Sequence, residues 1–139
     1  MCAAQSLTDI EILMYYDARP CAYNGLFDFY TKEPLKGYYP FKMFNELYKM
    51  GKACECVIEG ASIYSSAAKD DNGNSAVMLC LYTDDDTDTL EKEIKLRFIG
   101  GKAEYDIYLL DAWHTDELIG KVSAGQTITI KPNSVVLLK

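Results

Sequence analysis

Apolar and polar positions follow two different periods along this chain of 139 residues. After the first quarter of the chain, large apolar side chains recur three and four residues apart, which places them on one face of a helix. These side chains are Phe41, Phe44, Leu47 and Tyr48. Pro40 suits a first helical turn, because its missing N–H would be unpaired there, and Gly51 suits a helix end. The pattern predicts an amphipathic helix that begins at Pro40 and ends at Gly51.

The segment before this helix carries a short apolar run and several turn signals. The run at residues 10–16 is bounded by polar residues, which is typical of a short buried strand. Asn24-Gly25 and Pro34 indicate turns in the long loop that follows. One strand and one helix offer no partner strand within their own segment. We therefore expect residues 1–51 to be the end of a larger unit.

Beyond Gly51 the hydrophobic period shifts toward two, which indicates strands. The strand-like runs lie at residues 53–59, 62–67, 76–83, 91–99, 104–110, 127–131 and 134–138. Seven strands at this spacing are typical of a sandwich. The sequence therefore predicts a mainly β fold, in which residues 52–139 form an immunoglobulin-like antiparallel β-sandwich domain and residues 1–51 form an N-terminal strand-loop-helix unit.

Alternation within these runs predicts which side chains form the core of the sandwich. One face of the run at 91–99 is apolar and the other charged, which suits a strand with one solvated face. The run at 104–110 is mostly apolar on both faces, so we expect a central strand. The predicted core consists of Ile94, Leu96, Phe98, Ile107, Leu109, Ile128, Ile130, Val136 and Leu138.

Charge and cysteine content exclude several classes of function. The formal net charge is −7, and a nucleic-acid partner would require clustered lysines and arginines, so we expect none. No apolar run approaches the roughly 20 residues that span a bilayer, and the N-terminus lacks the pattern of a signal peptide. The odd number of cysteines favours reduced thiols over a disulfide framework. Together these features favour a cytoplasmic protein with no membrane partner.

Three short motifs carry residue types found in metal or catalytic sites. The acidic run 84–88 is a solvated loop or, less in keeping with its spacing, a calcium site. Cys54-x-Cys56 favours packing over zinc, since further ligands are lacking. His114 is the chain's single histidine and follows a strand without a signalled nucleophile, which indicates a turn residue. The sequence therefore predicts no catalytic residue, no metal and no cofactor.

Several motifs resemble the C-terminal end of retaining glycoside hydrolases with a (β/α)8 catalytic barrel, such as the family 39 β-xylosidases. Leu13-Met14-Tyr15-Tyr16-Asp17 resembles the last barrel strand. The loop and closing helix are matched by Asn24-Gly25-Leu26-Phe27-Asp28 and the Pro34 to Pro40 stretch, and Tyr105 to Asp111 resembles a strand of the following sandwich. The resemblance implies that residues 1–51 end a barrel and that residues 52–139 are an accessory domain.

This resemblance also implies what the chain lacks and what it would touch. In that clan the two catalytic glutamates come from earlier barrel strands, so this chain alone is predicted to be inactive. Barrel sites gather at the carboxyl ends of strands, so Asp17, Arg19, Tyr23 and Asn24 would lie near the substrate cleft. The alternative is that Asp17 and Arg19 pair to shape a turn and Tyr23 packs. The implied partners are an upstream barrel domain or a second copy of the chain.

Two other functions remain open from the sequence. Aromatic residues make up 12% of the chain, which with a sandwich fold suits a stand-alone carbohydrate-binding module that takes oligosaccharides. The third possible function is a protein-interaction domain, for which the sequence carries no specific motif. Without barrel partners, the predicted strand and helix would expose apolar surfaces. We therefore expect either self-association through residues 8–50 or poor order in much of residues 1–36.

Overall fold

The structure is a computed structural model that describes residues 1–20, 25–60, 62–85 and 87–139, with the backbone alone for residue 6. Its helices are α1 (Cys2–Leu7), the 3-10 turn η1 (Lys36–Tyr38) and α2 (Tyr39–Met50). Its strands are β1 (Lys52–Cys54), β2 (Ile63–Lys69), β3 (Ser75–Leu81), β4 (Lys92–Lys95), β5 (Glu104–Leu110), β6 (Thr115–Ser123), β7 (Thr127–Ile130) and β8 (Ser134–Leu138). The fold is mainly β with antiparallel pairing, as the sequence predicts.

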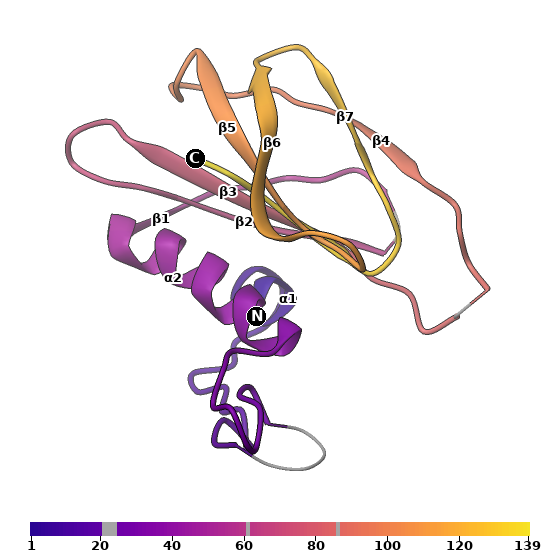
Figure 1. Ribbon diagram of the computed structural model, residues 1–139. Coiled ribbons are helices and arrows are strands. Elements are labelled where there is room, and N and C mark those ends of the chain that lie inside the picture. Colours follow the sequence, from indigo (N-terminus) through magenta and orange to yellow (C-terminus); the bar gives the residue numbers. More distant parts are fainter. Residues whose placement is uncertain (21–24, 61, 86) are drawn as a thin grey trace.

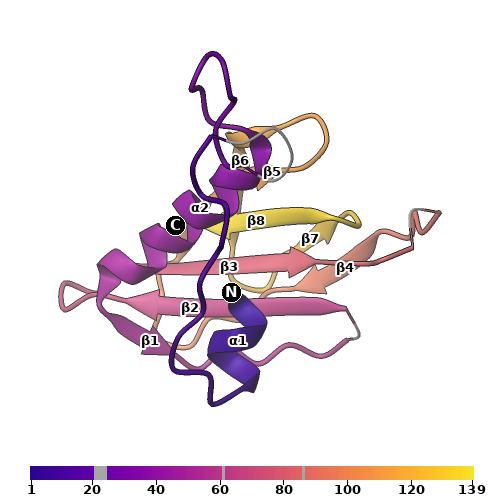
Figure 2. The same cartoon turned by 90° about the horizontal axis from the view of Figure 1, so that it is seen from below.

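Three layers build the molecule. The central layer is a six-stranded sheet in the order β1-β2-β3-β8-β5-β6. The pair β4-β7 forms a second sheet on one side of it, and α1 and α2 cover the other side (Figure 1). Figure 2, seen from the helical side, shows α1 and α2 lying across the face of β2, β3 and β8. Two sheets packed over a shared core are consistent with the predicted β-sandwich.

Strand β8 is the centre of the large sheet, and all five of its residues are buried. It pairs with β3 on one side and β5 on the other, so Val136 stands between Leu79 and Leu109. Its next neighbour, Leu137, stands between Met78 and Tyr108 on the opposite face of the sheet. A strand covered on both faces needs apolar side chains at every position. This explains why Ser134–Leu138 carries an almost unbroken apolar run.

The core between the two sheets confirms the predicted set of core residues. Leu96, Ile128, Ile130, Val136 and Leu138 are buried in it. The other predicted members, Ile94, Phe98, Ile107 and Leu109, are partly buried and pack against it. The strands β4 and β7 contribute to this core from one side, because the paired residues Ile94 and Ile128 point into it. Their neighbours Glu93 and Thr129 point to the opposite face.

A second apolar core lies between the large sheet and the helices. From α2, Met43 and Leu47 are fully buried in it, and from α1 it receives Cys2. The helix ends as predicted, because Gly51 adopts a left-handed conformation (φ 86°) and donates its N–H to the carbonyl of Tyr48. Tyr48 itself is exposed, so the buried face is centred on Met43 and Leu47 rather than on the side where Tyr48 lies. The prediction that Tyr48 lies on the buried face of the helix was therefore wrong.

Several predicted strand boundaries differ from the structure. Residues 10–16 lie outside any sheet in the described part of the chain, so the predicted strand there is wrong. The run at 53–59 pairs only as Lys52–Cys54, and 91–99 pairs only as Lys92–Lys95. The sequence also missed α1 and the edge strand β6. Strands need partners as well as propensity, and an edge strand such as β6 needs little apolar alternation.

The structure describes four of the cysteines and all of the helices named above. Cys2, Cys54, Cys56 and Cys80 are free thiols, and Cys2 and Cys80 belong to the helix-side core. Cys21 lies outside the described residues. Burial raises the pKa of Cys80 to about 11, which keeps this thiol protonated near neutral pH. None of the described helices has the length and apolar character needed to cross a bilayer.

Candidate functional site

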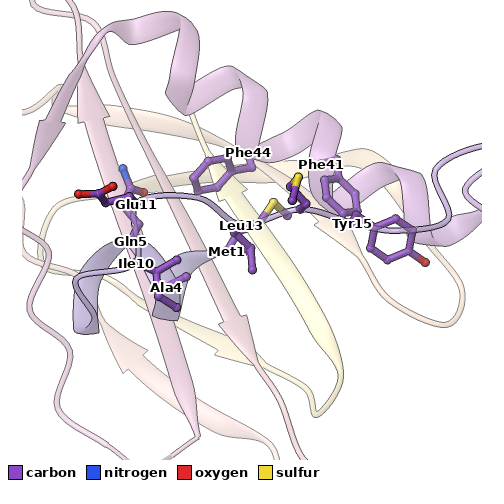
Figure 3. A pocket seen from close by; sticks show the side chains of 10 residues that line it. Met1, Ala4, Gln5, Ile10, Glu11, Leu13, Tyr15, Phe41 and Phe44 are labelled. Atoms are coloured by element: carbon purple, nitrogen blue, oxygen red, sulfur yellow. The ribbon is translucent and has the colours of Figure 1, made fainter.

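An apolar groove lies between α1, α2 and the chain segment that follows α1 (Figure 3). Its volume is about 580 Å³. Phe41 and Phe44 of α2 form one wall, and Leu13 and Tyr15 form the other. Met14 also lines the groove. The rings of Tyr15 and Phe41 meet edge to face with their centroids 5.3 Å apart. The segment thus contacts the helix through aromatic rings and joins no described sheet.

The same segment exposes an unusual amount of apolar surface. Six large apolar side chains between residues 10 and 16 are exposed, each with 46% or more of its surface open to solvent. They are Ile10, Ile12, Leu13, Met14, Tyr15 and Tyr16, with Met14 at 84% and Tyr16 at 96%. Contiguous apolar patches of this kind mark interaction sites more often than scattered single residues do. The groove and this segment together form the first candidate site.

A second candidate site is the turn of the β5–β6 hairpin, residues 111–114, which we call the hairpin tip. Asp111 organises it, because its Oδ1 accepts the N–H of Trp113 at 2.8 Å and the N–H of His114 at 2.7 Å. The same oxygen lies 2.9 Å from Nδ1 of His114. Trp113 projects from this braced turn with 86% of its surface exposed. The result is a single indole presented to solvent on a fixed backbone.

The hairpin tip is also tied to the start of α2 (Figure 2). Lys36 donates its ammonium to the carbonyl oxygens of Asp111, at 2.6 Å, and Ala112. A second tie joins Lys42 Nζ to Asp116 Oδ2 at 2.5 Å. The hydrogen bond to Asp116 raises the pKa of Lys42, which keeps the ammonium charged. Two lysines from the N-terminal third therefore fix the hairpin against the helix.

A β-bulge aims Asp116 at the helix. Leu110 pairs with Thr115 and Leu109 pairs with Glu117, so Asp116 is an extra residue in β6. It adopts a left-handed conformation (φ 54°), which aspartate tolerates better than most residues. Bulges of this kind redirect a side chain and twist the strand locally. Here the redirected carboxylate, only 10% exposed, meets Lys42.

The protonation of Asp111 is set by two opposing effects. Burial disfavours its charged form, whereas the hydrogen bonds from the N–H groups of His114 and Trp113 favour it. The hydrogen bonds outweigh burial, and the pKa of Asp111 is lowered from its ordinary value. The carboxylate that braces the hairpin tip is therefore ionised at neutral pH.

The structure describes two of the four residues predicted to lie near a substrate cleft, Asp17 and Arg19. Asp17 is partly exposed and Arg19 exposed, both just after the apolar segment. No ion pair joins these two side chains in the described structure, so the alternative in which they pair finds no support there. Tyr23 and Asn24 lie outside the described residues. The substrate-binding role of all four stays a prediction.

The acidic loop resembles an ordinary capped turn. Asp85 Oδ1 accepts hydrogen bonds from the N–H and the hydroxyl of Thr87, and the hydroxyl of Tyr82 donates to Asp84. Asp86 lies outside the described residues. Among residues that the structure describes, no group of three His, Cys, Asp or Glu side chains is placed to hold a metal ion. The less favoured alternative of a calcium site in this loop therefore finds no support among the described residues.

Sequence reasoning missed the hairpin tip as a site. The sequence indicates His114 as a turn residue, which is where the structure places it. The signal that could have found the site is the spacing of Asp111 from the next N–H groups, because aspartate often braces a turn in this way. The exposure of the only tryptophan could not be read from the sequence.

Comparisons with known proteins show a likeness to a solved structure. No protein-family model matches the chain, and no curated protein matches its sequence. Among solved structures, the chain is similar to a GH30 endoxylanase from Clostridium papyrosolvens C71, with a TM-score of 0.67 and 17% identity. The likeness covers 83% of this chain and 30% of that chain, so this chain spans less than a third of the length of that enzyme. Identity at this level shows a shared fold.

Proposed function

We propose that this chain is a non-catalytic C-terminal region of a glycoside hydrolase, in which the β-sandwich supports a separate barrel catalytic domain. The observation that carries the proposal is the likeness to the endoxylanase, which covers most of this chain but only 30% of that one. A chain that matches such a part fits an accessory region better than a complete enzyme. The finer assignment to the clan of the family 39 β-xylosidases rests on the motifs of the sequence alone.

The apolar groove and segment support an accessory role. Retaining glycoside hydrolysis uses two carboxyl groups about 5 to 5.5 Å apart. The described lining of the groove includes one acid, Glu11, among mostly apolar side chains. Such a surface suits protein packing rather than acid and base chemistry. In this proposal residues 10–16 and the outer face of α2 meet the barrel domain.

Turnover assays test the non-catalytic role. The purified chain is incubated with aryl β-xylosides, aryl β-glucosides and xylan, and released phenol or reducing ends are measured. We expect no turnover above that of a heat-denatured sample. Saturable turnover that disappears when Glu11 or Asp17 is changed to the amide would overturn the proposal, since it would place catalysis within this chain.

The DNA upstream of the Met1 codon gives an independent test of the supporting role. The proposal expects it to encode a (β/α)8 barrel that carries two glutamates at the ends of its strands. If such a barrel is encoded, co-expression of the barrel with this chain is expected to yield a complex that survives size-exclusion chromatography. A barrel that is fully active and monomeric in the presence of this chain would contradict the supporting role.

A further inference from the structure

We propose that the hairpin tip is a binding site for a neutral oligosaccharide, with Trp113 as the surface on which one pyranose ring stacks. This inference rests on the proposed function, because the fold is shared with an enzyme named as an endoxylanase. It assigns a ligand to a part of the molecule that the supporting role does not use. The groove and residues 10–16 are a different surface.

The exposure of Trp113 is the first observation behind the proposal. Tryptophan is a large side chain that is usually well buried, yet here 86% of it faces solvent. A pyranose has an apolar face of C–H groups and a rim of hydroxyls, so it can cover an indole while its hydroxyls stay hydrated. Contact between the apolar face of a ligand and an aromatic ring is a source of affinity in open, shallow sites.

The rigidity of the hairpin tip is the second observation. Three contacts to Oδ1 of Asp111 fix the backbone of Trp113 and the ring of His114. Lys36 fixes the same turn from the other side through the carbonyl oxygens of Asp111 and Ala112. A turn ordered before binding loses little entropy when the ligand arrives. The backbone that carries the indole is therefore ordered before the ligand binds.

Polar groups beside the indole suit hydroxyl recognition. The Nδ1 atom of His114 is engaged by Asp111, so Nε2 is the ring nitrogen that can meet a ligand hydroxyl from this partly exposed side chain. The carboxylate of Asp111 accepts the N–H groups of the turn and so stabilises the turn. A net charge of −7 disfavours anionic polymers, which points to a neutral sugar.

A protein partner fits the hairpin tip less well than a sugar does. Stable protein interfaces bury about 800 Å² on each partner and centre on several clustered apolar anchors. The hairpin tip offers one indole between Ala112 and the polar side chains of Asp111 and His114. The surface that has clustered anchors is the segment at residues 10–16, in a different part of the chain.

Intrinsic fluorescence tests the site directly, because Trp113 is the single tryptophan of the chain and all tryptophan emission comes from it. The probe is xylohexaose, with cellohexaose as a second neutral ligand and a galacturonate hexamer as an anionic comparison. We expect a saturable change of emission with a neutral ligand at a Kd between about 0.1 and 10 mM, and a far weaker response to the anion. No response to either neutral sugar would overturn the proposal.

Matched variants separate stacking from other effects. Trp113→Ala is expected to weaken binding at least about tenfold by calorimetry, while Tyr48→Ala, an equally open aromatic near the other end of α2, leaves it unchanged. Circular dichroism checks that both variants keep the fold. Equal binding by Trp113→Ala would refute the site. Emission that changes with protein concentration but not with sugar would instead assign Trp113 to a protein contact.

The two proposals can fail separately. A chain that binds neither sugar and has no turnover removes the hairpin site and leaves the accessory role in place. A chain that binds xylohexaose and also hydrolyses it removes the accessory role and leaves the binding site in place.

Discussion

At the scale of single residues, Gly101 lies in a closely packed part of the sandwich. A Cβ at this position would meet the hydroxyl of Tyr105 and lie 3.2 Å from the Cβ of Phe98. Tyr105 cannot move away easily, because it is 1% exposed and its hydroxyl is held by Ser75 at 2.5 Å and by the N–H of Lys102 at 3.0 Å. We predict that Gly101→Ala lowers the free energy of unfolding by about 1 to 3 kcal/mol, measured in urea.

Gly120 provides the matched control for this substitution. It lies in the edge strand β6, and an added Cβ there would meet nothing within 4 Å. Gly120→Ala is therefore expected to change the free energy of unfolding by less than about 0.5 kcal/mol. If the two variants unfolded at the same urea concentration, the close contact with Tyr105 would not constrain the fold.

At the scale of elements, α2 is an integral part of the helix-side core rather than a detachable end. Met43 is 0% exposed and packs in this core with Leu47, Met78 and Leu137. We predict that Met43→Ala lowers the free energy of unfolding of the whole chain by about 2 to 5 kcal/mol. Met14→Ala is the control, since Met14 is 84% exposed. Loss of the helical signal before the sheet signal on heating would show that α2 is not coupled to the sandwich.

The hairpin between β5 and β6 is predicted to respond to acid through Asp111. Burial opposes the charge of this carboxylate, but the N–H groups of His114 and Trp113 outweigh it, so its pKa in the folded state lies below the ordinary value of about 3.9. The stabilisation is then fully present above that ordinary value and is lost as the pH falls through the lowered, folded-state pKa. The hairpin tip should be unchanged at about pH 5 and should loosen only in stronger acid.

Amide resonances of Trp113 and His114 measure this transition, because both N–H groups donate to the titrating carboxylate. They are expected to shift together as Asp111 takes up a proton. Asp111→Asn keeps an acceptor oxygen at the same position without an acidic proton, so the shift should vanish in this variant. A shift that persists in Asp111→Asn would assign the acid response to another group.

At the scale of the whole molecule, the sequence predicted those parts of the fold that carry their own pattern. Strand β8 was predicted to the residue because burial on both faces demands a continuous apolar run. Strand β6 was missed because its edge position tolerates Asp116, Glu117 and Gly120, which hide any alternation. The site at Trp113 depends on contacts with Lys36, which is 75 residues from Asp111 and cannot be paired with it by periodicity.

The predicted strand at residues 10–16 failed for a related reason. An apolar run shows a preference for an extended backbone, but a strand forms only where a second strand accepts its hydrogen bonds. In the described part of the chain, the sheet ends at β1 on one side and β6 on the other, and residues 10–16 join neither edge. The segment instead borders the groove, where its Tyr15 ring contacts the ring of Phe41.

The exposed segment at residues 10–16 leads us to predict self-association through residues 8–50. Covering Ile12 and Met14 in a second copy would remove apolar surface from water, at about 25 cal/mol per Å². We expect the mass from light scattering to rise above the 15.6 kDa of one chain as concentration increases. The double variant Ile12→Ser, Met14→Ser should stay closer to one chain, whereas Ile99→Ser, which removes an equally exposed side chain elsewhere, should associate as before. A chain that stays monomeric, with the amides of residues 12–16 strongly protected from hydrogen exchange, would refute both association and an unpaired segment.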